Sequence, residues 1–181
     1  KSSALSWSTL PMPDSAPRTD ILIRPATPQD NQRCQDIAVA AWTPIYASSR
    51  AALGDDIYAH LHPDGLASKA RQIAAAFAAH LDHILIACDP HTKEVLGFAT
   101  FRLDHDRKIG EIGNNAVDPA CRGRGIGAAL YQHVLARFRQ EGMTVARVTT
   151  GLDDAHAPAR AAYQKVGFER ATQSITYYQK L

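Results

Sequence analysis

Residues 122–127 read Arg-Gly-Arg-Gly-Ile-Gly, and this glycine spacing is suited to phosphate binding. The segment follows an apolar, strand-like run and precedes an amphipathic helix. A glycine-rich turn at the beginning of a helix directs several unpaired backbone N–H groups toward one point, at the positive end of the helix dipole. Glycine is required where a Cβ would keep a diphosphate from approaching the backbone. With added charge from Arg122 and Arg124, the segment predicts a binding site for a phosphorylated cofactor.

The positions of the glycines argue against two common nucleotide-binding motifs. A dinucleotide fingerprint reads G-x-G-x-x-G and needs an acidic residue about 20 positions later. Here the glycines stand at positions 123, 125 and 127, and Gly142 takes the place of the acid, with Glu141 beside it. No Gly-Lys-Ser/Thr follows, which excludes a P-loop. A nucleotide-dependent oxidoreductase on a Rossmann fold is therefore disfavoured.

A second motif lies at residues 156–168, which read His-Ala-Pro-Ala-Arg-Ala-Ala-Tyr-Gln-Lys-Val-Gly-Phe. It is similar to the closing motif Asn-x-x-Ala-x-x-hydrophobic-Tyr-x-Lys-x-Gly-Phe of the GNAT superfamily of acyl-CoA N-acyltransferases. The matching residues are Ala159, Tyr163, Lys165, Gly167 and Phe168. His156 stands where the family usually has Asn, and Ala162 where it usually has Leu. Residues 117–127, read as Val-Asp-Pro followed by Arg-x-x-Gly-x-Gly, likewise resemble the coenzyme A loop of this superfamily.

The resemblance implies a fold, a cofactor and a reaction. The implied fold is α/β (α+β mixed): a GNAT fold with a mostly antiparallel central sheet of about six to seven strands flanked by helices. Acetyl-CoA is the implied cofactor, and its acetyl group passes directly to a primary amine within a ternary complex. In this family the fourth and fifth strands splay apart, and the pantetheine arm lies between them. The residues implied to hold the cofactor are Asn115, Ala116, Val117, Arg122, Gly123, Arg124, Gly125, Ile126, Gly127 and His156.

Two residues are predicted to move protons in this reaction. Tyr163 matches the family's tyrosine, and its phenol is predicted to protonate coenzyme A as it leaves as a thiolate. Glu111 is the predicted general base for the attacking amine, acting directly or through water. Period-2 alternation along its strand places Glu111 on the same face as Gly113 and Asn115, and the missing side chain at Gly113 would leave room for a substrate. Weaker alternatives near strand ends are Asp104, Asp106, Asp153 and Asp154.

Hydrophobic periodicity and turn residues predict the elements that position these groups. Pro44 is predicted to end the first helix, and Gly142 to end the helix that follows the glycine loop. Residues 49–80 are predicted to be mostly helical, with a break at residues 63–65. The predicted strands are residues 21–24, 83–88, 95–103, 109–117, 145–150 and 175–179; further predicted helices are residues 28–43, 69–80 and 156–166.

The composition is that of a single globular domain. A chain of 181 residues, of which 45% are apolar and 21% charged, is long enough to bury a full core. The domain is predicted to span residues 20–181, after a flexible N-terminal arm at residues 1–19. A net charge of +2 does not indicate a nucleic-acid-binding surface, and no apolar run approaches the ~18 residues of a membrane span. Three cysteines without metal-ligand spacing predict reduced thiols, a cytoplasmic location and no metal site.

The acceptor is expected to be a primary amine on a small molecule or a peptide. The segments that would select it, residues 28–80 and 104–108, follow no family pattern, and a homodimer is compatible with the fold. One alternative stays open, a regulatory module that binds coenzyme A on the same fold without turnover. The two functions differ in whether the chain supplies a usable base in addition to Tyr163.

Overall fold

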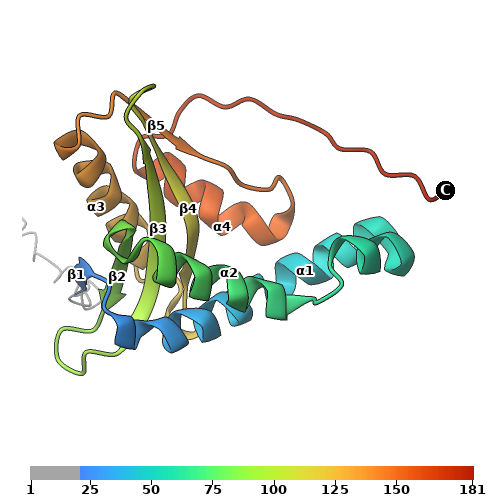
Figure 1. Cartoon of the computed structure of the whole chain (residues 1–181), viewed down its shortest axis with the longest axis horizontal. Coiled ribbons are helices and arrows are strands. Elements are labelled where there is room, and N and C mark those ends of the chain that lie inside the picture. The colour runs from blue at the N-terminus through green and yellow to red at the C-terminus, as the bar shows by residue number, and fades with distance from the viewer. Residues whose placement is uncertain (1–20) are drawn as a thin grey trace, which may run out of the picture.

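The structure is a computed structural model that describes residues 21–181 (Figure 1). The predicted flexible arm at residues 1–19 lies outside the described residues. Five strands form one sheet in the order β1-β2-β3-β4-β5, in which every neighbouring pair is antiparallel except β4 and β5. The strands are β1 (Leu22–Pro25), β2 (Ile84–Cys88), β3 (Val95–Asp104), β4 (Ile109–Val117) and β5 (Val145–Val148).

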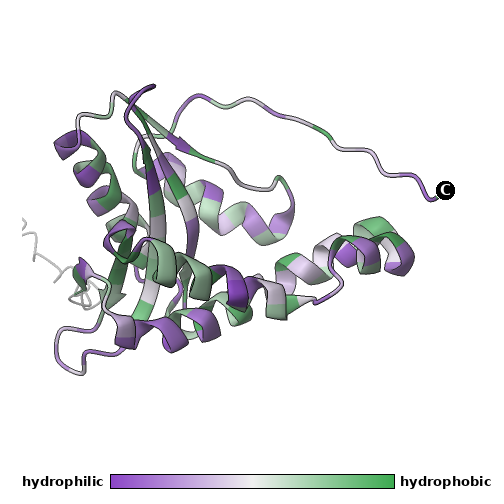
Figure 2. Cartoon of the chain, viewed as in Figure 1, coloured by the Kyte–Doolittle hydropathy of each residue, from purple (hydrophilic) through white to green (hydrophobic). Residues whose placement is uncertain are grey.

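Helices pack on both faces of this sheet, and β2 and β3 between them carry mostly apolar residues (Figure 2). On one face, Ile37 and Ile73 pack against Phe98, and on the other, Leu130 and Phe138 belong to a second cluster. Complete burial of such a side chain contributes about 1.5–3 kcal/mol to folding. The helices are α1 (Asn31–Leu61) and α2 (Leu66–Ala79) on the first face, and α3 (Ile126–Gln140) and α4 (Ala157–Lys165) on the second.

The sequence predicted that the first helix ends at Pro44, and this prediction is wrong. Helix α1 continues through Pro44 to Leu61, with a kink at Gly54, whose φ is 74°. A proline inside a helix removes one backbone hydrogen bond. Packing beyond the proline favours continuation, because the hydroxyl of Tyr46 lies 3.2 Å from that of Ser68 on α2. Beyond the sheet, α1 and α2 therefore extend as a two-helix arm (Figure 1). The predicted break at residues 63–65 is confirmed, since α1 ends at Leu61 and α2 begins at Leu66.

The sheet of the described residues has fewer strands than predicted. Residues 175–179, predicted as the last strand, pair with no other strand in this part of the chain, and Ile175 and Tyr177 are 74% and 84% exposed. A β-branched and aromatic segment forms a strand only where an edge accepts its hydrogen bonds and its apolar face is covered. The C-terminal tail instead runs toward the helical arm (Figure 1), where Lys180 Nζ lies 2.5 Å from Asp56 Oδ2.

A β-bulge in β4 changes which face its side chains occupy. Ala99 pairs with Asn115 and Phe101 pairs with Ile112, so two residues of β4 stand opposite Thr100. As a result, Ile112 packs in the cluster with α3, whereas Ala116, four residues later, packs in the cluster with α1. Regular alternation would have kept both on one face.

Strands β4 and β5 diverge beyond the bulge. Their parallel pairing ends with Ile112 opposite Val148, although β4 continues to Val117. Residues 113–117 therefore have β3 on one side and no strand pairing with β5 on the other. The predicted splay of the fourth and fifth strands is present.

Candidate active site

A cleft with a volume of about 1010 Å³ opens where β4 and β5 diverge. Its walls come from α1, α2 and β3 at one end, and from the glycine loop, α3 and α4 at the other. Most of the predicted site residues line it: Glu111, Asn115, Ala116, Val117, Arg122, Gly123, Gly125, Ile126, Gly127, His156 and Tyr163. Arg124 lies on the same loop, is exposed, and is not among the lining residues.

The glycine loop has the geometry of an anion-binding turn. Gly123 and Gly125 have φ values of 80° and 79°, a region that L-residues with a side chain rarely adopt, and Gly125 is the N-cap of α3. A Cβ built on either glycine meets no atom within 4 Å, so the space above the backbone is open. The first backbone N–H groups of α3, which have no acceptor within the helix, border this space.

A 3-10 turn, η3 (Pro119–Cys121), connects β4 to this loop and holds it in place. Its N-cap, Asp118, accepts a hydrogen bond from the backbone of Ala120 at 2.9 Å. Arg33 of α1 forms an ion pair with the same carboxylate, which links the loop to a helix on the opposite face of the sheet.

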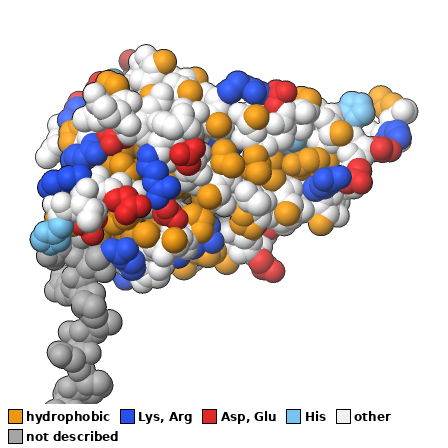
Figure 3. All heavy atoms as spheres, turned by 90° about the horizontal axis from the view of Figure 1, so that it is seen from below, with side chains coloured by type: hydrophobic (Ala, Val, Ile, Leu, Met, Phe, Trp, Pro, Cys, Tyr) orange, Lys and Arg blue, Asp and Glu red, His pale blue; other side chains and the backbone are white. Residues whose placement is uncertain are grey.

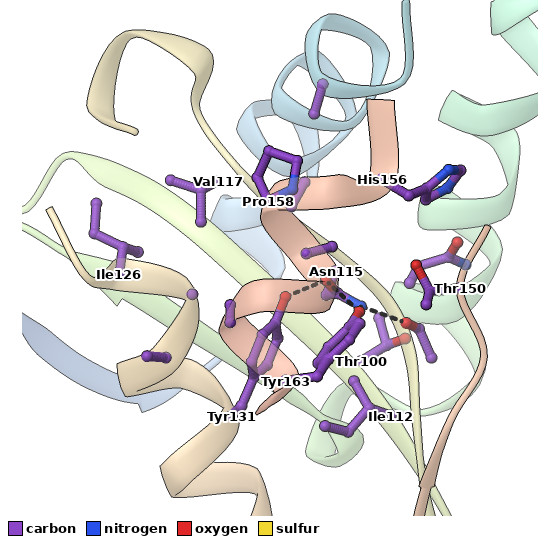
Figure 4. Close-up of a pocket in the computed structure, with 18 of the residues that line it drawn as sticks. Thr100, Ile112, Asn115, Val117, Ile126, Tyr131, Thr150, His156, Pro158 and Tyr163 are labelled. Atoms are coloured by element: carbon purple, nitrogen blue, oxygen red, sulfur yellow. Dashed lines mark hydrogen bonds between the residues drawn. The ribbon is translucent and has the colours of Figure 1, made fainter. Parts of the chain in front are cut away.

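A hydrogen-bonded cluster of two tyrosines and one asparagine lies in the cleft (Figure 4). The hydroxyl of Tyr131 donates to Asn115 Oδ1 at 2.7 Å. The Asn115 amide group donates to the Gly113 carbonyl at 2.9 Å and to the Tyr163 hydroxyl at 3.1 Å. The rings of Tyr131 and Tyr163 lie 4.7 Å apart. Asn115 is thereby fixed with its oxygen toward one phenol and its nitrogen toward the other.

Both phenols are protonated at neutral pH. Burial raises the pKa of Tyr163, although hydrogen bonds with Asn115 and Tyr131 work in the opposite direction. Burial also raises the pKa of Tyr131. Sequence reasoning did not identify Tyr131, because it lies among the core residues of α3 at helical spacing. A tyrosine at a core position of a helix could have indicated a polar partner nearby, because a buried tyrosine hydroxyl group usually forms a hydrogen bond.

Glu111 also lines the cleft, but it lies on the face of the sheet that α1 and α2 cover. Asn115 and the two tyrosines lie on the opposite face. Its carboxylate lies 2.6 Å from a nitrogen of Arg147 and 3.1 Å from one of Arg102. The hydrogen bond from Arg147, together with both positive charges, lowers the pKa of Glu111 despite partial burial. Because of the bulge, the prediction that Glu111 shares a face with Asn115 is wrong.

The predicted space at Gly113 is occupied by a neighbour on β3. A Cβ on Gly113 would lie 2.6 Å from the side-chain oxygen of Thr100. The glycine thus permits the two strands to pack closely at the bulge and does not leave a space for a substrate.

His156 is held by a short hydrogen-bonded loop before α4. Its Nδ1 lies 2.7 Å from Asp153 Oδ2, and an ionised carboxylate can only accept, so Nδ1 carries the proton. Burial acts to raise the pKa of Asp153, but the hydrogen bond from His156 keeps this pKa below its usual range. Arg160 donates to the carbonyls of Gly151 and Asp153 at 2.7 and 2.8 Å. In neutral His156 this arrangement leaves Nε2 as an acceptor.

The other carboxylates predicted as alternatives do not line the cleft: Asp104, Asp106, Asp153 and Asp154. Asp104 is instead paired with Arg107 at 2.7 Å. Within residues 21–181, no group of three or more His, Cys, Asp or Glu residues could hold a metal ion. None of the helices in this part of the chain is long and apolar enough to cross a membrane. On the face seen in Figure 3, acidic and basic side chains are interspersed.

Comparison with protein families adds to this geometry. Residues 42–168 match the model of the Acetyltransferase (GNAT) family, which is more than half of the chain. The chain belongs to the GNAT acetyltransferase family. Acetyl-CoA is the acetyl donor of this family, and the predicted GNAT fold is confirmed by the solved structures that the chain resembles.

Two of these GNAT structures were solved with the donor or its product. A GNAT acetyltransferase from Brucella melitensis, in complex with acetyl-CoA, is 22% identical with a TM-score of 0.56, and the match covers 84% of each chain. The PaiA N-acetyltransferase from Thermoplasma acidophilum, in complex with coenzyme A, is 16% identical with a TM-score of 0.63. That match covers 86% of this chain and 93% of the other.

A curated relative of this GNAT chain is the mycothiol acetyltransferase of Segniliparus rotundus. The two are 35% identical over 72 residues, which is 40% of this chain and 26% of the relative. The chain therefore spans about a quarter of the length of that relative.

Proposed function

We propose that the protein transfers an acetyl group from acetyl-CoA directly to a primary amine, within a ternary complex. The observation that carries this proposal is the cluster of Tyr131, Asn115 and Tyr163. It places a protonated phenol at the open edge of β4, where β4 and β5 no longer pair. The rings of Tyr131 and Tyr163 pack in the core cluster with α3, and both residues also line the cleft.

The residues present fit acetyl-CoA. The first N–H groups of α3, together with Arg122, would hold the diphosphate, because the space above Gly123 and Gly125 is open. The backbone edge at residues 115–117 would bind the pantetheine arm as an added strand does, and His156 lines the same cleft. When bound, acetyl-CoA supplies the acetyl group as a thioester. A backbone N–H of this edge would polarise its carbonyl group.

Tyr163 is the proposed proton donor to the leaving sulfur. Asn115 Nδ2 donates to the Tyr163 oxygen at 3.1 Å, whereas the reverse bond, from Tyr163 to Asn115 Oδ1, is longer at 3.3 Å. The phenolic hydrogen therefore makes only a long hydrogen bond within the cluster, so it can turn toward a ligand in the cleft. The donation leaves a phenolate that Asn115 continues to stabilise, and one proton-transfer group of this kind contributes about 10²–10⁴-fold to a rate.

Glu111 is the proposed acceptor of the amine proton, through water. Its carboxylate lines the α1–α2 end of the cleft and is ionised at neutral pH. The two arginines that lower its pKa also make it a weaker base, so its contribution should lie at the lower end of the range for a general base. His156 is the alternative acceptor, because its Nε2 has a lone pair in the neutral ring.

A coenzyme A-binding regulatory module without turnover is the second candidate function. The two ion pairs of Glu111 favour it, since they engage the carboxylate that turnover would use. The experiment that separates the two is an amine screen with acetyl-CoA in which free thiol release is measured. Acetyl transfer predicts amine-dependent release above the rate of hydrolysis. Tight coenzyme A binding with no release from any amine would favour the regulatory module.

A further inference from the structure

Lys69 of α2 is a buried cation in the cleft, and the proposed transfer does not use it. It is 8% exposed, although a lysine can normally extend its ammonium group into solvent. Its Nζ donates to Gln72 Oε1 at 2.9 Å and to Asn114 Oδ1 at 3.1 Å. The same nitrogen lies 4.5 Å from the centre of the Trp42 ring.

These partners are all neutral. None of the ion pairs formed within residues 21–181 includes Lys69. Burying a charge is costly unless a countercharge compensates it, and here burial lowers the pKa of the lysine. An ammonium group has three donors, of which two are occupied by Gln72 and Asn114. One donor is left for a ligand, and the positive charge, which the Trp42 ring compensates only in part, has no carboxylate partner among the described residues.

Lys69 lies at the α1–α2 end of the cleft, the end that the proposed cofactor site leaves for the acceptor. Lys69 and Trp42 line the cleft on the α1–α2 face, whereas the glycine loop and Tyr163 lie on the α3–α4 face. Asn114, which Lys69 contacts, belongs to the bulge of β4 where the two ends of the cleft meet. The indole of Trp42 adds an apolar wall beside the ammonium group.

We propose that Lys69 binds a carboxylate of the acceptor, so that the acceptor class is amino acids and related molecules that carry both an amine and a carboxylate. This assignment rests on the proposed acetyl transfer. A single remaining donor on a compact point charge suits one carboxylate oxygen. The carboxylate would supply the countercharge that the neutral partners of Lys69 do not, and Trp42 would pack against the carbon part of the acceptor.

The test uses the whole chain of 181 residues and compares L-amino acids with their carboxamides as acetyl acceptors. Thiol release from acetyl-CoA is measured at equal concentrations of unprotonated amine, because an amino acid and its amide differ in amine pKa. The wild type should have a lower KM for the acids than for the amides. Lys69→Met should raise the KM for the acids by about 10- to 100-fold and leave the amides nearly unchanged.

Two further variants separate the anion site from a general effect on folding or charge. Arg71→Met removes one positive charge from the exposed side of the same helix, where Arg71 pairs with Asp64, and should retain the preference for acids. Lys69→Gln keeps an amide for hydrogen bonds to Gln72 and Asn114, so it covers the case in which Lys69→Met does not fold. Protection from thermal unfolding by coenzyme A reports that each variant keeps the other end of the cleft.

The outcomes distinguish the anion site from the transfer reaction. Equal use of acids and amides, or a preference that persists in the folded Lys69 variants, would refute the anion site and leave acetyl transfer intact. Calorimetric binding of the acids that requires Lys69, without any thiol release, would support the anion site and contradict acetyl transfer. No binding and no turnover of any acid would refute the anion site.

Discussion

The two ends of the cleft use different chemistry. At the α3–α4 end, most groups that face the cleft are uncharged: backbone N–H groups, an amide and two phenols, with Arg122 and His156 beside them. At the α1–α2 end they include the buried charge of Lys69 and the ion-paired carboxylate of Glu111. Backbone and neutral groups suit a ligand that every member of a family shares, because many sequences can supply them. Charged side chains suit the ligand that distinguishes one member from another, because single substitutions change them.

The largest expected effect comes from changing the backbone at the cofactor end. Gly125→Val should abolish the protection that coenzyme A gives against thermal unfolding. The residue has a φ of 79°, which a β-branched side chain disfavours, and its Cβ would fill the space above the loop. Thermal unfolding with and without coenzyme A measures the effect. Full protection in the variant would show that the loop does not hold the diphosphate.

A smaller effect is expected from Glu111→Gln at the acceptor end. The rate should fall by about 10²-fold, the lower end for a general base, because two arginines make this carboxylate a weak one. Single-turnover acetyl transfer with a fixed amine is the measurement, and His156→Gln is the comparison. If His156→Gln costs more than Glu111→Gln, the base lies at the other end of the cleft.

The smallest effect is a change in pH dependence. The pKa of Glu111 is lowered, so its carboxylate loses its charge only as the pH falls below the usual range for glutamate. Arg147→Met should raise this pKa and move the acid limb of the rate to higher pH. Arg102→Met should move it in the same direction by less, since the hydrogen bond from Arg147 is the larger cause. Rate profiles that coincide with the wild type would show that Glu111 does not set the acid limb.

Local patterns in the sequence predicted much of this architecture. The strands β2, β3 and β4, the break between α1 and α2, and the glycine loop lie within a few residues of their predicted positions. Each is determined by alternation, turn residues or apolar periodicity over a short window. The motif at residues 156–168 also placed Tyr163 in the cleft, because it fixes the register of α4.

Features that depend on contacts between residues far apart in the sequence could not be predicted from these local patterns. One extra residue in β4 moved Asn115 to the face opposite Glu111, and only the pairing with β3 reveals that bulge. The continuation of α1 past Pro44 depends on packing against α2. Lys69 resembles an ordinary surface lysine in the sequence, and its burial results from its contacts with Asn114 of β4 and Trp42 of α1.

Tyr163→Phe tests the central claim most directly, that a protonated phenol at the open edge of β4 serves acetyl transfer. The substitution retains the ring, which packs 4.7 Å from that of Tyr131, and removes the only proton that the side chain can donate. Coenzyme A affinity should be unchanged, while single-turnover acetyl transfer falls by about 10–10³-fold, less than the full contribution of a proton donor because water can partly replace it. Tyr131→Phe is the matched control, because it removes a hydroxyl from the same cluster without removing the proposed donor. A Tyr163→Phe variant that transfers acetyl at the wild-type rate would contradict the account.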